Sequence, residues 1–236
     1  GISLGIEDNI ENLLNRIDVS IKKGYQRIKI KIKPGWDIKI VKKIRQKFPL
    51  VNLMVDANSA YCLDDVKLLK KLDEFNLMMI EQPLDHDDII QHAKIQRALK
   101  TSICLDESIC SPEDAISEIE LKSCKVINIK QARVGGFTNA KKIHDICLKN
   151  KIPVLCGGLL ETGIGRAHNI ALASLENFSL PGDISASERY YSPDIINPIV
   201  KLENNGTINV SQGIGIGYEV RTDILNKYTV NKIVIN

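Results

Sequence analysis

Five ionisable side chains recur at nearly equal intervals along this chain of 236 residues, each after a short apolar run of the kind that forms a β-strand. Successive positions are 25, 25, 25 and 24 residues apart, a length that suits one strand followed by one helix. The C-terminal ends of parallel strands in a barrel meet at one mouth, so we expect these groups to form a ring of charges there. They are Lys31, Asp56, Glu81, Asp106 and Lys130.

Three of the five groups are carboxylates, and carboxylates that share a cavity repel one another. A bound divalent cation relieves this repulsion. Ligands that are all oxygen, without His or Cys, favour a hard ion, and Mg2+ is the best match. We therefore predict that Asp56, Glu81 and Asp106 bind Mg2+. The alternative is that each acid caps a helix or lies in a loop, and that the spacing is accidental.

The two lysines of the ring would flank this metal. An unprotonated lysine is a base and a protonated one is an acid, so Lys31 or Lys130 could remove the proton next to a carboxylate that the metal holds. Lys31 belongs to IKIKIK, residues 28–33, whose period of two predicts a strand with one apolar and one cationic face. The cationic face would point either to water, as on a sheet edge, or into the cavity. The ring of charges favours the cavity.

Strand-like and helix-like patterns alternate along the chain and would position these groups. The pattern predicts parallel βαβ units in an α/β barrel of the (β/α)8 type. An open doubly wound sheet is the alternative, but no GxGxxG motif opens a helix after the first strand. The expected strands cover residues 2–6, 27–32, 51–56, 77–81, 102–106, 125–130, 152–157 and 178–183. The expected helices cover residues 8–23, 36–48, 137–150 and 165–175, with one more that begins after Ser111.

The last fifty residues differ in character from the rest. We expect a catalytic barrel over residues 1–186 and an extension over residues 187–236 that packs outside it.

Composition excludes several other classes of protein. A net charge of +3 and 5% aromatic residues argue against a nucleic-acid partner, and no apolar run reaches the roughly 18 residues of a membrane helix. None of the six cysteines forms a CxxC pair, so we expect reduced thiols and a cytoplasmic location. The sequence leaves open whether the protein is a homo-oligomer.

Several longer segments resemble the o-succinylbenzoate synthase and N-acylamino acid racemase family, in the muconate-lactonizing subgroup of the enolase superfamily. They are KIKIKPGWD, VDANSAY, IEQPL, CLDES, NIKQARVGG, CGGLLETGIGRAHNIALASL and LPGDISAS. One departure is Gln131–Ala132, where many relatives have Pro–Gly. The resemblance implies a modified TIM barrel, (β/α)7β, with Mg2+ as cofactor and Mn2+ as its substitute. It also implies an N-terminal capping domain that this chain lacks, against which the extension 187–236 would normally pack.

The resemblance also implies a role for each site residue. Lys31 is similar to the general base and acid, Lys29 to its electrostatic neighbour, and Lys130 to the second lysine on the opposite face of the substrate. Asp56, Glu81 and Asp106 are similar to the metal ligands. Glu107 matches an acid beside the last of these. Positions that resemble the substrate pocket are Ser3, Asn58, Gly158 and Leu160.

The implied activity is a carbon–oxygen lyase reaction on a small carboxylate. It is the Mg2+-dependent syn dehydration of 2-succinyl-6-hydroxy-2,4-cyclohexadiene-1-carboxylate, through an enediolate, in menaquinone biosynthesis. An alternative with the same two lysines is racemisation of N-acylamino acids. A third hypothesis, from another class, is a catalytically silent barrel that serves as a structural or interaction domain.

Overall fold

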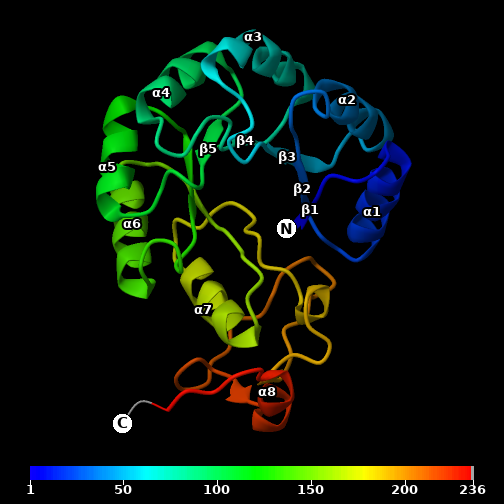
Figure 1. Cartoon of the computed structure of the whole chain (residues 1–236), viewed down its shortest axis with the longest axis vertical. Coiled ribbons are helices and arrows are strands. Elements are labelled where there is room, and N and C mark those ends of the chain that lie inside the picture. The colour runs from blue at the N-terminus through cyan, green and yellow to red at the C-terminus, as the bar shows by residue number, and fades with distance from the viewer. Residues whose placement is uncertain (235–236) are drawn as a thin grey trace.

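Short apolar segments form a curled sheet of seven parallel strands in the computed structural model, which describes residues 1–234. The strands pair in sequence order, and helices run along the outer side of the sheet (Figure 1). The fold is therefore α/β and of the TIM-barrel type, as predicted. The strands are β1 (Ile2–Leu4), β2 (Arg27–Lys31), β3 (Asn52–Asp56), β4 (Ile80–Glu81), β5 (Ile103–Leu105), β6 (Val126–Ile129) and β7 (Val154–Cys156).

Most of the outer helices were predicted from their apolar period. The expected helices at residues 8–23, 36–48, 137–150 and 165–175 are present, with ends that differ by no more than two residues. Ser111 caps a further helix as expected, because its Oγ accepts a hydrogen bond from the backbone N–H of Asp114 at 3.1 Å. The helices are α1 (Ile10–Lys22), α2 (Ile38–Lys47), α3 (Val66–Leu69), α4 (Ile89–Ala98), α5 (Pro112–Leu121), α6 (Phe137–Lys149), α7 (Gly163–Ala173) and α8 (Thr222–Tyr228).

The sequence analysis did not predict α3, α4 or α8. Short 3-10 turns flank α3 at Leu63–Asp65 and Lys70–Phe75, and another lies at Ser187–Arg189. No helix within residues 1–234 has both the length and the apolar character needed to cross a bilayer.

Strand β2 has both faces buried, which settles the orientation of the IKIKIK segment. Ile28, Ile30 and Ile32 belong to the main core between the sheet and the helices. Lys29 faces the other way and is only 3% exposed, in ion pairs inside the curled sheet. The cationic face therefore lines the interior, and only Lys33, beyond the end of the strand, is exposed.

A second, smaller core fills the inside of the curled sheet. Its members come from five successive strands or the residue just before one, and all are almost fully buried: Met54, Met79, Cys104, Val126 and Leu155. This apolar layer is the floor on which the polar groups of the strand ends rest.

The predicted eighth strand, FSLPGD at 178–183, is wrong. This segment follows β7 closely, since the N–H of Asp183 donates to the carbonyl of Cys156 at 2.8 Å and Asn177 accepts from Val154 at 3.3 Å. Within residues 1–234 it makes no backbone hydrogen bond to β1, so it does not form a ladder. Pro181 has no N–H to donate, which disfavours a strand at this point.

The C-terminal segment packs on α7 from outside the sheet. Ile170 of α7 forms a small apolar cluster with Ile195, Ile196 and Val200. Asp194 accepts a hydrogen bond from the N–H of Gly163, at the start of α7, at 2.8 Å. A short antiparallel pair, β8 (Ile196–Asn197) and β9 (Glu219–Val220), and helix α8 complete this segment.

Candidate functional site

A layer of charged side chains lies directly above the apolar floor. Because side chains alternate along a strand, the residue two positions beyond each floor residue points the same way. Two beyond Met54, Met79 and Cys104 come Asp56, Glu81 and Asp106, and all three carboxylates are buried. The strand register also pairs Lys31 with Asp56 and Asp56 with Glu81. The folding pattern thus gathers the carboxylates of three successive strand ends.

The lysines of β2 bind these carboxylates from one side. Lys29 Nζ lies 3.0 Å from Glu81 Oε2 and 3.3 Å from Asp56 Oδ2. Lys31 Nζ donates to Asp56 Oδ2 at 2.6 Å and to Asn58 Oδ1 at 2.5 Å. The predicted substrate residue Asn58 therefore contacts the predicted base directly.

Asn58 is itself fixed by two further hydrogen bonds. Its backbone N–H donates to Asp56 Oδ1 at 3.0 Å, and its Nδ2 donates to Glu107 Oε1 at 2.8 Å. Its φ is +41°, a left-handed conformation that Asn tolerates better than most residues. Glu107, the acid after Asp106, thus acts on Lys31 only through Asn58.

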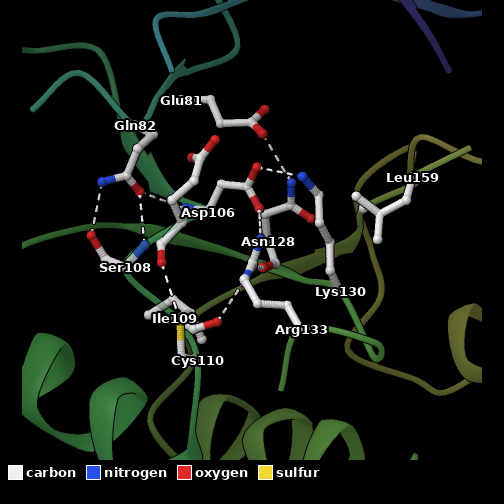
Figure 2. A network of polar contacts seen from close by, with 12 residues as sticks. Glu81, Gln82, Asp106, Ser108, Ile109, Cys110, Asn128, Lys130, Arg133 and Leu159 are labelled. Carbon is white, nitrogen blue, oxygen red and sulfur yellow. Dashed lines mark hydrogen bonds and ion pairs between the residues drawn. The ribbon is translucent and has the colours of Figure 1, made fainter. Parts of the chain in front are cut away.

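The opposite side of the layer is built by the end of β6 (Figure 2). Lys130 Nζ lies 2.6 Å from Asp106 Oδ2, and Arg133 Nη1 lies 2.5 Å from Asp106 Oδ1. Asn128 Nδ2 donates to Glu81 Oε1 at 3.0 Å and so connects β6 to β4. Lys31 and Lys130 approach the carboxylates from β2 and β6, which are four strands apart in the sheet.

Gln82 braces the turn that follows β5. Its Oε1 accepts from the backbone N–H of Asp106 at 3.0 Å and of Ser108 at 3.2 Å, while its Nε2 donates to Ser108 Oγ at 2.8 Å (Figure 2). These bonds fix the backbone that carries the Asp106 carboxylate.

Burial and charge shift the pKa values of these groups in opposite directions. Burial raises the pKa of Glu81 to about 8, and the charges of Asp56, Asp106 and Asp183 add to this rise although Lys29 opposes it. Burial also acts to raise the pKa of Asp106, but Lys130 and Arg133 outweigh it and hold that pKa below its usual value. Burial alone would lower the pKa of Lys29, yet its three carboxylate neighbours hold that pKa well above the usual value.

The donor set fits a hard divalent cation such as Mg2+. Asp56, Glu81 and Asp106 offer only carboxylate oxygens, and they are buried in one layer. Each carboxylate is paired with at least one lysine, and the ligand atoms of the three do not all lie within 4.8 Å of one another. In residues 1–234 only the exposed trio Asp85, His86 and Asp87 meets that distance, in the loop after β4.

A cavity of about 170 Å3 opens above the charged layer. Three lysines line it, together with both polar and apolar side chains, which suits a small anionic molecule with a carbon skeleton. Six residues predicted for the site line it: Ser3, Lys29, Lys31, Lys130, Gly158 and Leu160. Asn58, also predicted for the substrate pocket, is not among its lining residues. The other five lining residues were not predicted: Ile2, Leu159, Asp183, Ser185 and Tyr190.

Asp183 is the most consequential of the missed residues. It lies 2.5 Å from Lys29 Nζ and 2.6 Å from Arg27 Nη2, and all three side chains are almost fully buried. A signal was present in the sequence, because Asp183 ends the eighth apolar segment as Asp56 and Asp106 end the third and fifth. Arg27 likewise alternates with Lys29 on the cationic face of β2.

Residues 13–224 match the family model described as "Enolase C-terminal domain-like". An o-succinylbenzoate synthase from Bacillus subtilis is 55% identical over 97% of this chain and 61% of its own length. An N-succinylamino acid racemase from an Amycolatopsis species is 47% identical over 99% of this chain and 63% of its own length. The chain thus spans about three fifths of the length of these curated relatives.

Solved structures share the fold over almost the whole chain. An enolase superfamily member from Listeria innocua is 47% identical with a TM-score of 0.93, over 98% of this chain and 62% of that one. A dipeptide epimerase from Enterococcus faecalis, solved with Mg and the dipeptide L-Leu-L-Tyr, is 27% identical with a TM-score of 0.84, over 92% and 62% of the two chains.

Proposed function

The chain belongs to the enolase C-terminal domain-like family, and from this membership we propose that it forms the catalytic barrel of an o-succinylbenzoate synthase, a carbon–oxygen lyase. The observation that carries the proposal is the placement of Lys31 and Lys130. Both line one cavity, and each forms an ion pair with a buried carboxylate, Lys31 with Asp56 and Lys130 with Asp106. The 55% identity to a synthase supports the choice of reaction. The substrate we propose is 2-succinyl-6-hydroxy-2,4-cyclohexadiene-1-carboxylate, an intermediate of menaquinone biosynthesis.

We propose Asp56, Glu81 and Asp106 as the ligands of Mg2+, with Mn2+ as a substitute. When bound, the metal would supply positive charge beside the substrate's carboxylate. Lys29, Lys31, Lys130 and Arg133 neutralise the same carboxylates, so their ammonium and guanidinium groups must shift as ligands turn toward a cation.

The chain's own residues account for the proton movements. Lys31, unprotonated, takes the proton from the carbon next to the substrate carboxylate, and Asn58 orients its Nζ. The same lysine, now protonated, gives that proton to the departing hydroxyl, which leaves as water while the carbon–carbon double bond forms. Lys130 remains protonated and stabilises the developing negative charge. Five buried or half-buried cations face four carboxylates in this layer, which suits an anionic substrate.

Racemisation of N-acylamino acids is the second candidate activity. The 47% identity to an N-succinylamino acid racemase favours it, and the same two lysines would carry it out. Lys31 would take the α proton from one face, and Lys130 would return a proton to the other.

The test is to measure kcat/KM of the intact protein on both substrates, together with α-proton exchange in D2O. Lys31→Ala should lower the dehydration rate by about 10²–10⁴-fold, the usual contribution of a general base. Lys33→Ala is the matched control, since Lys33 is exposed just beyond β2, and it should retain the wild-type rate. The synthase proposal fails if the cyclohexadiene is not dehydrated while an N-acylamino acid exchanges its α proton.

We also propose the domain division and cellular setting suggested by the sequence. The barrel would cover residues 1–186, and residues 187–236 would form an extension that packs outside it and against a capping domain. Ser3, Gly158 and Leu160 would contact the small carboxylate substrate from the cavity wall. Six free cysteines, two of them exposed, suit the reducing cytoplasm.

A further inference from the structure

Asp183 forms ion pairs with two cations of the same strand face. Its Oδ2 is 2.5 Å from Lys29 Nζ, and its Oδ1 is 2.6 Å from Arg27 Nη2. The side chain of Asp183 is 7% exposed, and those of Lys29 and Arg27 are 3% and 0% exposed. Removal of either partner would leave an uncompensated buried charge, which is strongly destabilising.

The backbone around Asp183 is fixed as closely as its side chain. Its N–H donates to the carbonyl of Cys156 at the end of β7 at 2.8 Å. A methyl group on Gly158 would lie 2.5 Å from the carbonyl oxygen of Asp183, so the segment lies directly against the loop after β7. Arg27 donates through Nη2 to the carbonyl of Pro181 at 3.0 Å and holds the same segment from β2. Asp183 thus connects the end of β7, through its backbone, with β2, through its side chain.

Lys29 has three carboxylates around one ammonium group, and they differ in what else they do. Glu81 and Asp56, at 3.0 and 3.3 Å, are candidate metal ligands, whereas Asp183 lies nearest, at 2.5 Å, and follows β7. When Glu81 and Asp56 turn to a divalent cation, the Lys29 ammonium loses two of its acceptors and is repelled by the cation. Asp183 is the remaining acceptor.

We propose that Asp183 is a positioning residue that retains Lys29 beside the cation site and prevents its ammonium from competing for Glu81 and Asp56. This inference rests on the proposed function. Without the Asp183 carboxylate, Lys29 would move fully onto the two ligands, and a divalent cation would have to displace it. Asp183 therefore controls metal affinity through Lys29, without contact to the metal.

The experiment measures Mg2+ binding by isothermal titration calorimetry on the intact protein. Asp183→Asn should raise the Kd for Mg2+ by about 10–100-fold, the usual cost of removing a partner that orients a ligand. In the Lys29→Met background, which has no ammonium to compete, Asp183→Asn should change the Kd by less than about 3-fold, because coupled residues are non-additive. Asp183→Glu, which keeps the charge, should restore part of the affinity.

The matched control is Asp194→Asn. Asp194 is also buried and accepts from the N–H of Gly163 at 2.8 Å and from Ser187 Oγ at 2.6 Å, and neither partner belongs to the charged layer. This variant should lower the melting temperature and leave the Kd for Mg2+ unchanged.

The outcomes separate the two proposals. If the wild type binds no Mg2+, the proposed function is wrong. If the wild type binds Mg2+ and Asp183→Asn binds it equally well, only the role of Asp183 is wrong. If Asp183→Asn lowers the Mg2+ affinity equally in the wild-type and Lys29→Met backgrounds, the role of Asp183 is also wrong. The effect would then come from the lost charge alone and not from Lys29. Should Asp183→Asn fail to fold, Asp183→Ala replaces it, and a Kd for Mg2+ equal to that of the wild type would contradict the proposed role.

Discussion

At the scale of single residues, Gly157 makes room for the second lysine. It follows β7, and a methyl group built there would lie 2.6 Å from Cγ and 2.8 Å from Cε of Lys130, and would also collide with Asn128 Oδ1. Contacts this short do not occur, so the side chain of Lys130 or the backbone would have to move. The absent side chain of Gly157 therefore helps to direct Lys130 toward Asp106.

We predict that Gly157→Ala lowers kcat by about 10–100-fold, since displacement of a reacting group by about 1 Å can cost as much as 10²-fold. Overpacking should also lower the free energy of unfolding by about 1–3 kcal/mol. Steady-state kinetics and urea denaturation measure the two effects. Gly5→Ala is the control, because a methyl group on Gly5 meets nothing within 4 Å. Wild-type kcat in Gly157→Ala would show that Lys130 is not held by this gap.

At the scale of elements, α5 carries a buried acid that has no part in the site. Glu118 is fully buried, and neither of its carboxylate oxygens has a hydrogen-bond partner. The nearby Ser123 Oγ donates to the carbonyl of Ile89 in α4. Burial raises the pKa of Glu118 to about 7; the nearby Ser123 hydroxyl opposes this rise, and the negative charges of Asp114 and Asp88 add to it.

The raised pKa of Glu118 predicts how stability depends on pH. Between the unfolded value of 4.5 and the folded value of about 7, the folded protein binds more protons at Glu118 than the unfolded chain does. The contribution of Glu118 to the free energy of unfolding therefore falls as pH rises through this window, by up to about 3 kcal/mol. Glu118→Gln cannot titrate, so it should gain stability relative to wild type between pH 5 and pH 8.

Urea denaturation at the two pH values measures this difference. Glu120→Gln is the control on the same helix, because Glu120 is exposed, and its profile should follow that of the wild type. Parallel profiles for Glu118→Gln and wild type would contradict the prediction.

At the scale of the whole molecule, the candidate metal ligands tie three strands together, since Asp56, Glu81 and Asp106 come from β3, β4 and the end of β5. A ligand that binds only the folded state at 100 times its Kd adds about 2.7 kcal/mol to stability. For a chain of this size we expect saturating Mg2+ to raise the melting temperature by about 5–10 °C. Differential scanning calorimetry measures the shift.

Asp56→Asn should abolish this shift, and NaCl at equal ionic strength should not reproduce it. The absence of any shift in the wild type would favour the third hypothesis, a catalytically silent barrel with a structural role.

The sequence predicted most of this architecture because apolar period and charge spacing are local properties. Seven of the eight expected strands formed, and the ring from Lys31 to Lys130 lies at their ends. Gln82 and Asn128, which connect members of the ring, could not be predicted from the apolar periodicity of the sequence. They act through contacts between strands that are distant in sequence. Helix α4 was missed since its buried face includes His92 and Gln96, which an apolar count does not register.

The sheet does not close, because β1 and β7 are its two edge strands and are not paired with each other. Elsewhere adjacent strands are joined by ladders of backbone hydrogen bonds, but here Arg27 and Lys29 form ion pairs with Asp183, and Arg27 also donates to the carbonyl of Pro181. Closure at this point therefore depends on a few buried ion pairs and not on a ladder. We expect amide hydrogens at this joint to exchange with solvent sooner than those of β3 to β5. Their exchange should become slower when a divalent cation binds the nearby carboxylates. The width of the barrel opening would then depend on whether the cation site is filled.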